Sequence, residues 1–360
     1  MVDLDDEKEV GKLDKSNMLS SIEALGKQVS QTWDEMKYFD LPEDYKEIDS
    51  VVVSGMGGSN LGCEIIQSLY FESFPVSLRL VRGYHLPKYV NHRTLVILSS
   101  YSGSTEETLS CGKEALERGA KIIGIATGSK LEAFCNERHL PFFKINPVNN
   151  PCGQPRMGLG YSIIAQFGIF SKLGLIEIGD GDIDKVVYLL QENNKRYGIE
   201  APKNRNNAKI FAKELVDRIV IYMSSEFLFG ISYAIRNQLN ENAKHFGAVY
   251  EIPEINHHLM EGLKFPEKNI DSLTVLLLNS DLYDKNNMLR IDITKEVLKQ
   301  NHIDFLEFNA MSESKLFQAF EVLGFGSYLN FYISMLHGLD PSPIPYVDYF
   351  KKELERRRKS

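Results

Sequence analysis

The sequence is poor in the residues that build metal centres and disulfide frameworks. Four of its 360 residues are cysteine, and they stand far apart, at Cys63, Cys111, Cys135 and Cys152. No two of them have the short spacing of a zinc-ligand pair. Disulfide frameworks belong to short secreted chains, so a chain of this length is expected to keep its thiols free in a reducing cytoplasm. The sequence therefore predicts no metal site and no disulfide.

The sequence also lacks a basic surplus, a leader and an apolar run of membrane length. Its formal net charge is −8, which argues against a nucleic-acid-binding surface. The start is acidic, without the basic and apolar regions of a signal peptide. The longest apolar stretch, residues 219–235, is short for a membrane span and contains Glu226. We expect a cytoplasmic protein with no nucleic-acid or membrane partner, in which this stretch is a buried strand followed by a buried helix.

A hydroxyl-rich stretch is the most distinctive feature that the sequence does have. In Ser99-Ser100-Tyr101-Ser102-Gly103-Ser104-Thr105, here called the serine loop, six of seven side chains carry a hydroxyl. An apolar run at 95–98 precedes it and a helical pattern at 106–116 follows. A helix N-terminus leaves N–H groups unpaired and attracts anions, and each hydroxyl adds a donor. An ordinary helix cap needs one or two hydroxyls, so six favour a phosphate site.

Short apolar strands alternate with helical patterns along the chain. Strands are predicted at 51–53, 76–81, 94–99, 122–126 and 141–145, and again at 218–224, 247–252, 273–278 and 303–308. This alternation predicts an α/β fold with parallel sheets and right-handed crossovers. The predicted divisions are a flexible N-terminus at 1–15, a first domain at 16–200, a second domain at 201–340 and a C-terminal helix at 341–360. The serine loop lies in the first domain and has no equivalent in the second.

A glycine-rich turn follows the first predicted strand. Ser54-Gly55-Met56-Gly57-Gly58-Ser59-Asn60, here called the glycine loop, partly matches the dinucleotide-binding fingerprint. Asn60 stands at the third glycine position, and the next strand ends in Arg82 where an acid would hold a ribose. The match is weak, which argues against an NAD(P)-dependent dehydrogenase. The glycines still allow a ligand to approach the backbone closely.

Five motifs in a fixed order carry a resemblance to a known family. The glycine loop and the serine loop resemble the two sugar-phosphate loops of a sugar isomerase (SIS) domain. Pro155-Arg156, Asn240-Glu241-Asn242-Ala243-Lys244 and Glu254-Ile255-Asn256-His257-His258 narrow the resemblance to the bifunctional phosphoglucose/phosphomannose isomerases, which are found mainly in archaea. The resemblance runs from about residue 14 to the C-terminal helix. It implies two SIS domains, each a parallel sheet between layers of helices.

The resemblance also implies an activity and a site. The activity is aldose–ketose isomerisation, which interconverts glucose 6-phosphate, and mannose 6-phosphate as well, with fructose 6-phosphate. Substrate-binding positions of the family fall on Gly57, Gly58, Ser59, Ser100, Ser102 and Thr105. The catalytic positions fall on Glu241 as base, Arg156 beside the reacting carbons, His257 as the ring-opening group and Lys351 as a C-terminal active-site lysine. The family further implies a homodimer in which His257 reaches the neighbouring subunit's site.

The chemistry of such a reaction requires groups of these types. A carboxylate with a raised pKa can take a proton from carbon, and a fixed guanidinium can stabilise the resulting cis-enediolate. Histidine suits ring opening because it exchanges protons near neutral pH. No metal or redox cofactor is required. The sequence leaves the preference between glucose and mannose 6-phosphate open.

Each assigned residue also has an ordinary structural interpretation. Glu241 can be a solvated carboxylate paired with Lys244 one turn away, and Arg156 can be a surface charge in a loop. Lys351 stands in a charged helix end next to Lys352. His257 can be a surface histidine. For the whole protein, the main alternative is a non-catalytic sugar-phosphate-binding regulator with the same fold, which could dispense with these residues.

Overall fold

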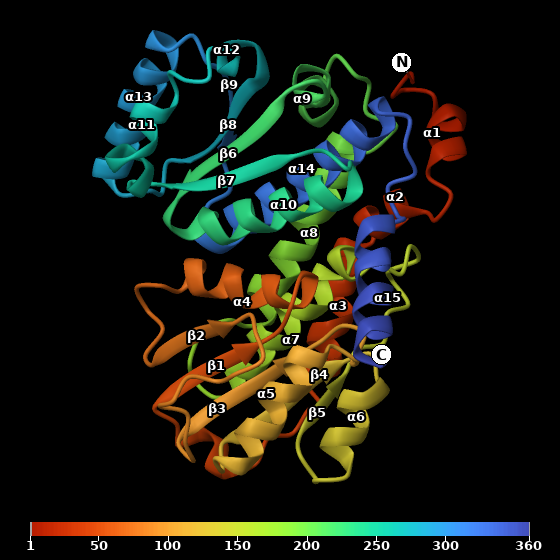
Figure 1. Ribbon diagram of the computed structural model, residues 1–360, viewed down its shortest axis with the longest axis vertical. Helices are drawn as coiled ribbons and strands as arrows, with labels where there is room; N and C mark the ends of the chain where they lie inside the picture. The colour runs from red at the N-terminus through yellow and green to blue at the C-terminus, as the bar shows by residue number, and fades with distance from the viewer. Residues whose placement is uncertain (1, 360) are drawn as a thin grey trace.

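The computed structural model describes residues 2–359. Its two α/β domains lie one above the other in Figure 1. The strands of the first domain are β1 (Ser50–Ser54), β2 (Ser77–Val81), β3 (Thr94–Ser99), β4 (Lys121–Ala126) and β5 (Phe142–Lys144). The strands of the second are β6 (Ile219–Ser225), β7 (Gly247–Ile252), β8 (Leu273–Ser280) and β9 (Asp304–Ala310). Each predicted strand is present, and the predicted α/β fold is confirmed.

Helices cover and connect the two sheets. In the first half they are α1 (Glu7–Leu13), α2 (Met18–Glu23), α3 (Leu25–Met36), α4 (Gly58–Leu69), α5 (Glu106–Glu117), α6 (Ser129–Asn136), α7 (Leu159–Lys172) and α8 (Asp180–Tyr197). In the second half they are α9 (Asn207–Leu215), α10 (Phe229–Asn242), α11 (Leu259–Gly262), α12 (Asn269–Ser272), α13 (Lys285–Gln300), α14 (Lys315–Leu336) and α15 (Pro345–Lys359). Short 3₁₀ helices are η1 (Glu43–Lys46), η2 (Pro155–Met157), η3 (Glu226–Leu228) and η4 (Glu254–His257).

The first sheet is parallel throughout, in the order β2-β1-β3-β4-β5. Alternate side chains on a strand face opposite sides of the sheet. Val51 and Val53 therefore join one apolar core, with residues of α4 and α7, while Val52 and Val96 join another, with residues of α5 and α6. Burial on both faces explains why β3 is apolar along its whole length. Because β1 and β3 are parallel neighbours, the glycine loop and the serine loop, which follow them, lie at the same carboxyl edge of the sheet.

The second sheet is also parallel, in the order β7-β6-β8-β9. Helix α14 packs against α8, α9 and α10, and every residue from Phe317 to Leu336 is buried. A helix enclosed on all sides needs no polar face, which accounts for apolar residues all around it. Its buried polar side chains Gln318, Glu321 and Asn330 are hydrogen-bonded. The apolar stretch at 219–235 forms β6, η3 and the start of α10, as expected. Among the described residues, no helix is long and apolar enough to cross a membrane.

Two N-terminal expectations differ from the structure. Where the sequence predicts a flexible segment at 1–15, residues 7–13 form α1, and Leu4 and Val10 are buried. Lys209 Nζ fixes this segment by donating to Asp5 Oδ1 at 2.9 Å. The apolar spacing over residues 16–38 predicts one helix, whereas the structure divides this segment into α2 and α3 at Ala24. The boundaries of the two domains stay a prediction.

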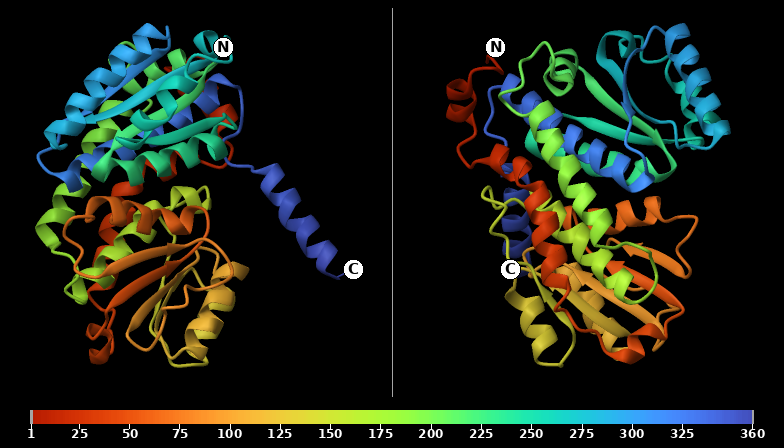
Figure 2. Two further views of the ribbon diagram at one scale, coloured as in Figure 1. Left: turned by 60° about the vertical axis from the view of Figure 1, so that its left-hand side comes forward. Right: turned by 180° about the vertical axis from the view of Figure 1, so that it is seen from behind.

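Helix α15 stands apart from both sheets. Figure 2 shows it projecting from the body of the protein. Its large apolar side chains Tyr346, Val347, Tyr349 and Phe350 are all exposed. At its far end Arg358 bonds Glu106, the first residue of α5, and Tyr84. A helix with an exposed apolar face gains little stability from packing on its own chain, and such a face is typical of a surface that binds another protein.

Candidate active site

The serine loop is held in place by its own hydroxyls. Ser100 Oγ accepts the Gly103 N–H at 3.1 Å and lies 2.8 Å from Thr105 Oγ1. This pair of hydroxyls keeps one hydrogen free for a ligand, since a single bond between them uses only one. Ser102 is exposed, 3.2 Å from Ser104 Oγ. The loop therefore presents hydroxyls at the start of α5.

Backbone donors add to these hydroxyls. Thr105, the N-cap of α5, makes no side-chain capping bond. Within the described chain, the N–H groups of Ser102, Thr105 and Glu106 donate to no acceptor. Free N–H groups at the N-terminus of a 12-residue helix, together with the helix dipole, favour a bound anion. This geometry suits a phosphate group, as the sequence predicts.

The glycine loop supports the serine loop from the side. Ser59 is buried, its Oγ accepts the Tyr101 N–H at 2.7 Å, and its carbonyl accepts Ser99 Oγ at 2.7 Å. A Cβ at Gly58 would lie 3.0 Å from the backbone of Pro155, so glycine here permits close contact between α4 and η2. The resemblance implies that the Ser59 hydroxyl contacts substrate. In the structure this hydroxyl accepts a hydrogen bond from the backbone of the serine loop instead. Gly57 has φ +53° and open space around it.

Arg156 lies beneath these loops and is 1% exposed. All five of its N–H donors have acceptors within the chain. The acceptors are Asn242 Oδ1 for Nε, Gln154 Oε1 (2.8 Å) and Glu241 Oε2 (3.4 Å) for Nη1, and the carbonyls of Pro341 (3.0 Å) and Ser342 (2.9 Å) for Nη2. This network rules out the interpretation of Arg156 as a surface charge. Sequence reasoning missed Gln154 and Asn242, although both stand within two residues of predicted site residues.

Glu241 is the acidic partner of Arg156 and lies at the end of α10. Burial raises the pKa of the Glu241 carboxyl, while the charges of Arg156, Lys351 and Lys244 act to lower it. The side chain is 33% exposed, so solvent and small molecules can reach it. A carboxylate with a raised pKa beside a fixed guanidinium is suited to accept a proton from carbon. Lys351 and Lys244 therefore act on Glu241 through their charge, whereas Arg156 is its ion-pair partner.

His257 is the one predicted catalytic residue that the structure does not bring to this site. It is exposed, in η4 after the carboxyl end of β7. Glu241 lies at the other end of that strand, since Gly247 N–H at its start donates to Asn240 Oδ1 at 2.9 Å. Six residues of strand separate the two edges by about 17 Å. Within one described chain, His257 makes no hydrogen bond or ion pair with Arg156, Glu241 or the serine loop.

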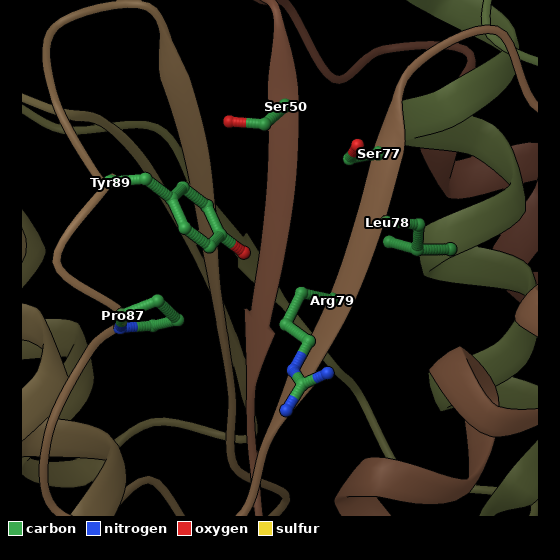
Figure 3. Close-up of a pocket in the computed structure, with 6 residues that line it drawn as sticks. All are labelled: Ser50, Ser77, Leu78, Arg79, Pro87 and Tyr89. Carbon is green, nitrogen blue, oxygen red and sulfur yellow. The ribbon is translucent and has the colours of Figure 1, made fainter.

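A surface pocket elsewhere in the first domain is not this site. It is lined by Ser50, Ser77, Leu78, Arg79, Pro87 and Tyr89, and Figure 3 shows these side chains around the starts of β1 and β2. The serine loop follows the opposite, carboxyl edge of the same sheet. In parallel α/β sheets ligands bind at the carboxyl edge, so we assign no role in catalysis to this pocket.

Two parallel sheets, with a hydroxyl loop leading into α5, define a protein of the SIS class of sugar-phosphate isomerase folds. Residues 204–354 match the family model described as "Bacterial phospho-glucose isomerase C-terminal SIS domain". The chain is 33% identical to a bifunctional phosphoglucose/phosphomannose isomerase of Caldicellulosiruptor bescii, over 94% of this chain and 98% of that protein. The chain therefore belongs to the family of bifunctional phosphoglucose/phosphomannose isomerases, as the motifs predict.

One further relative is similar in sequence, and one solved structure is similar in fold. A D-glucosamine-6-phosphate 4-epimerase of Sulfolobus acidocaldarius is 28% identical over 66% of this chain and 75% of its own length. The crystal structure of a hypothetical protein of Thermus thermophilus superposes with a TM-score of 0.75 at 16% identity, covering 98% of this chain and 93% of that chain. At this identity the second match concerns the fold alone.

Proposed function

We propose that this chain is an isomerase that interconverts glucose 6-phosphate and mannose 6-phosphate with fructose 6-phosphate in the cytoplasm. The observation that carries the proposal is the ion pair between Arg156 Nη1 and Glu241 Oε2, which lie 3.4 Å apart. The family to which the chain belongs and the serine loop, which is suited to a phosphate, support the same proposal. A non-catalytic regulator would have no use for a carboxylate with a raised pKa beside a buried guanidinium. The four thiols are free and buried, which suits a reducing compartment.

The proposed reaction assigns a step to each group. The serine loop and the first turn of α5 hold the phosphate, which anchors the open-chain sugar. The Glu241 carboxylate takes the proton from C2 of the aldose, giving a cis-enediolate, and returns it to C1. The hydroxyl proton of O2 passes to O1 in the same conversion, so that C2 becomes the carbonyl carbon of the ketose. The Arg156 Nη1–H bonded to Glu241 is the longest of the five bonds, so it is the donor most easily turned toward an enediolate oxygen. The nearby charge of Lys351 adds to this stabilisation.

A coupled assay with separate hexose 6-phosphates tests the proposal. We expect fructose 6-phosphate to be converted to glucose 6-phosphate and mannose 6-phosphate by the purified chain alone. Glucosamine 6-phosphate is included because one relative is named as an epimerase of that sugar. Conversion of glucosamine 6-phosphate without conversion of fructose 6-phosphate would contradict the proposal and favour an epimerase. Binding of all sugars without turnover would favour the regulator.

We further propose that two copies of the chain share their active sites. Two features support a dimer: His257 and Glu241 of one chain lie at opposite ends of β7, a strand about 17 Å long, and α15 exposes an aromatic face. A second copy related by a two-fold axis would place His257 of each chain at the site of the other, giving two equivalent sites. The exposed side chains Tyr346, Tyr349 and Phe350 would then be covered by the second copy.

Mixed dimers test the shared site. A His257→Ala chain and a Glu241→Gln chain are each expected to be nearly inactive. Co-expressed, they form heterodimers in which one site carries both defects and the other carries neither, so activity should return toward half of the wild-type value per heterodimer. His258→Ala in place of His257→Ala is the matched control and should retain activity alone. Proven heterodimers without recovery would show that His257 acts in its own chain or not at all.

A further inference from the structure

Three successive backbone carbonyls before α15 are bound by two cations from the candidate site. Residues 340–342 are here called the strap. Lys244 Nζ donates to the carbonyls of Asp340 (3.1 Å) and Pro341 (2.9 Å), and Arg156 Nη2 donates to those of Pro341 and Ser342. The Pro341 carbonyl therefore accepts from both cations. Pro341 and Ser342 are buried, although the chain on both sides of them is more exposed.

The backbone of Lys244 indicates that the residue is kept for its side chain. Lys244 has φ +52°, in the left-handed region two residues after the end of α10. Glycine is favoured at that position because a Cβ there is strained. Burial and the charge of Arg156 lower the pKa of the Lys244 ammonium to about 8, against the opposite effects of Asp340 and Glu241. Both the backbone conformation and the charge of Lys244 are therefore unfavourable for folding.

The strap connects the candidate site to α15. The chain before the strap is tied to the end of α10 by His245 Nδ1 and His337 Nε2, which lie 3.0 Å apart. After the strap, α15 contributes Lys351, whose charge acts on Glu241. Most side chains of α15 are exposed, so packing on its own domains contributes little to its position. Bonds to the strap carbonyls fix the chain before its start, and the bonds of Arg358 to Glu106 and Tyr84 hold its far end.

We infer that Lys244 is a positioning residue: it fixes the strap through two carbonyls and so holds α15, with Lys351, over Glu241. The effect on catalysis rests on the proposed isomerase function, but the effect on α15 does not. Arg156 cannot replace Lys244, because both N–H groups of its Nη2 already donate to the carbonyls of Pro341 and Ser342. Without Lys244 the carbonyl of Asp340 would therefore have no cationic donor.

Replacing Lys244 with glycine tests the inference without risking the fold. Lys244→Gly removes the ammonium and relieves the backbone, so we expect Tm to stay or rise. We expect amide hydrogen exchange of α15 to become faster, and kcat to fall about 10- to 100-fold with KM little changed, because misplacement by about 1 Å can cost this much. Lys244→Arg keeps a charged donor and should recover most of kcat.

His302→Gly is the matched control. His302 has φ +56° and stands at the corresponding position after α13, far from the strap in the fold. It should gain stability in the same way, without change in kcat or in exchange of α15. If Lys244→Gly behaves like His302→Gly in both exchange and kcat, the inference is wrong. If the wild-type chain has no isomerase activity, hydrogen exchange still decides the role of Lys244, while the proposed function fails separately.

The dependence of kcat on pH gives a second test of the role of the Lys244 ammonium. Because the pKa of Lys244 is about 8, the ammonium loses its proton above that pH, and the bonds to the strap weaken. The charged groups that face it are Arg156, Glu241 and Asp340. We expect wild-type kcat to fall above about pH 8 and the Lys244→Arg variant to keep its activity to higher pH, since arginine stays charged. An identical alkaline limb in the two proteins would contradict the inference.

Discussion

Glu241→Gln is expected to abolish isomerisation while leaving the fold and phosphate binding intact. Glutamine has almost the same shape but cannot accept a proton from carbon, and proton transfer by a placed base contributes about 10²- to 10⁴-fold. The amide can still accept the Arg156 Nη1–H, so the buried guanidinium keeps its partners. We therefore expect kcat to fall by that factor, with Tm and competitive inhibition by inorganic phosphate close to wild type.

The matched control for this substitution is Glu23→Gln. Burial also raises the pKa of the Glu23 carboxyl, but this residue ends α2 and does not contact Arg156. It should retain full activity, which separates a carboxyl with a raised pKa in general from the one at the site. A fall of less than about tenfold in the Glu241→Gln variant, far below the contribution of a placed base, would point to another base.

Removing two hydroxyls of the serine loop is expected to weaken substrate binding strongly. In a Ser102→Ala, Thr105→Ala variant, two hydrogen bonds to a charged phosphate are lost, at roughly 1.5–3 kcal/mol each. The sum of about 3–6 kcal/mol corresponds to a rise in KM of about 10²- to 10⁴-fold, measured with fructose 6-phosphate. Neither hydroxyl is required by the core: Ser102 is exposed, and Thr105 bonds only Ser100 among side chains.

Ser110→Ala provides the comparison for the double variant. Ser110 lies on the same helix, α5, but one turn beyond its N-terminus. It should leave KM unchanged. A double variant with wild-type KM for fructose 6-phosphate, or one that loses kcat alone, would mean that the phosphate is held elsewhere. In that case the unpaired N–H groups at the start of α5 would need another explanation.

The fold could be predicted from the sequence because its signals are local. Residues 94–99 are predicted as a strand and form β3 over the same range, since six consecutive buried positions need an apolar run. The serine loop is equally local: one turn carries the hydroxyls, the helix start and the free N–H groups. Its role in binding is still a prediction, but its position between β3 and α5 follows from neighbouring residues alone.

The contacts of Arg156 could not be predicted, because they join distant segments. The carbonyls of Pro341 and Ser342 lie 185 and 186 residues away in the chain, and a carbonyl has no signature in a sequence. The spacing of Glu241 and Lys244 predicts a pair one turn apart, whereas Lys244 Nζ donates to carbonyls of the strap and of Asn242. The apolar anchors Leu4 and Val10 stand singly among acidic neighbours, so the sequence carries little signal of the folded N-terminal segment.

The central claim, proton transfer at carbon by Glu241, is tested most directly by isomerisation in heavy water. The chain is incubated with fructose 6-phosphate in D₂O, and the aldose products are examined by proton NMR. Because a carboxylate exchanges its proton with solvent, we predict glucose 6-phosphate and mannose 6-phosphate that carry deuterium at C2, with no product from the Glu241→Gln variant. Products with protium at C2, formed by the Glu241→Gln variant at the wild-type rate, would indicate a hydride shift and would contradict the account.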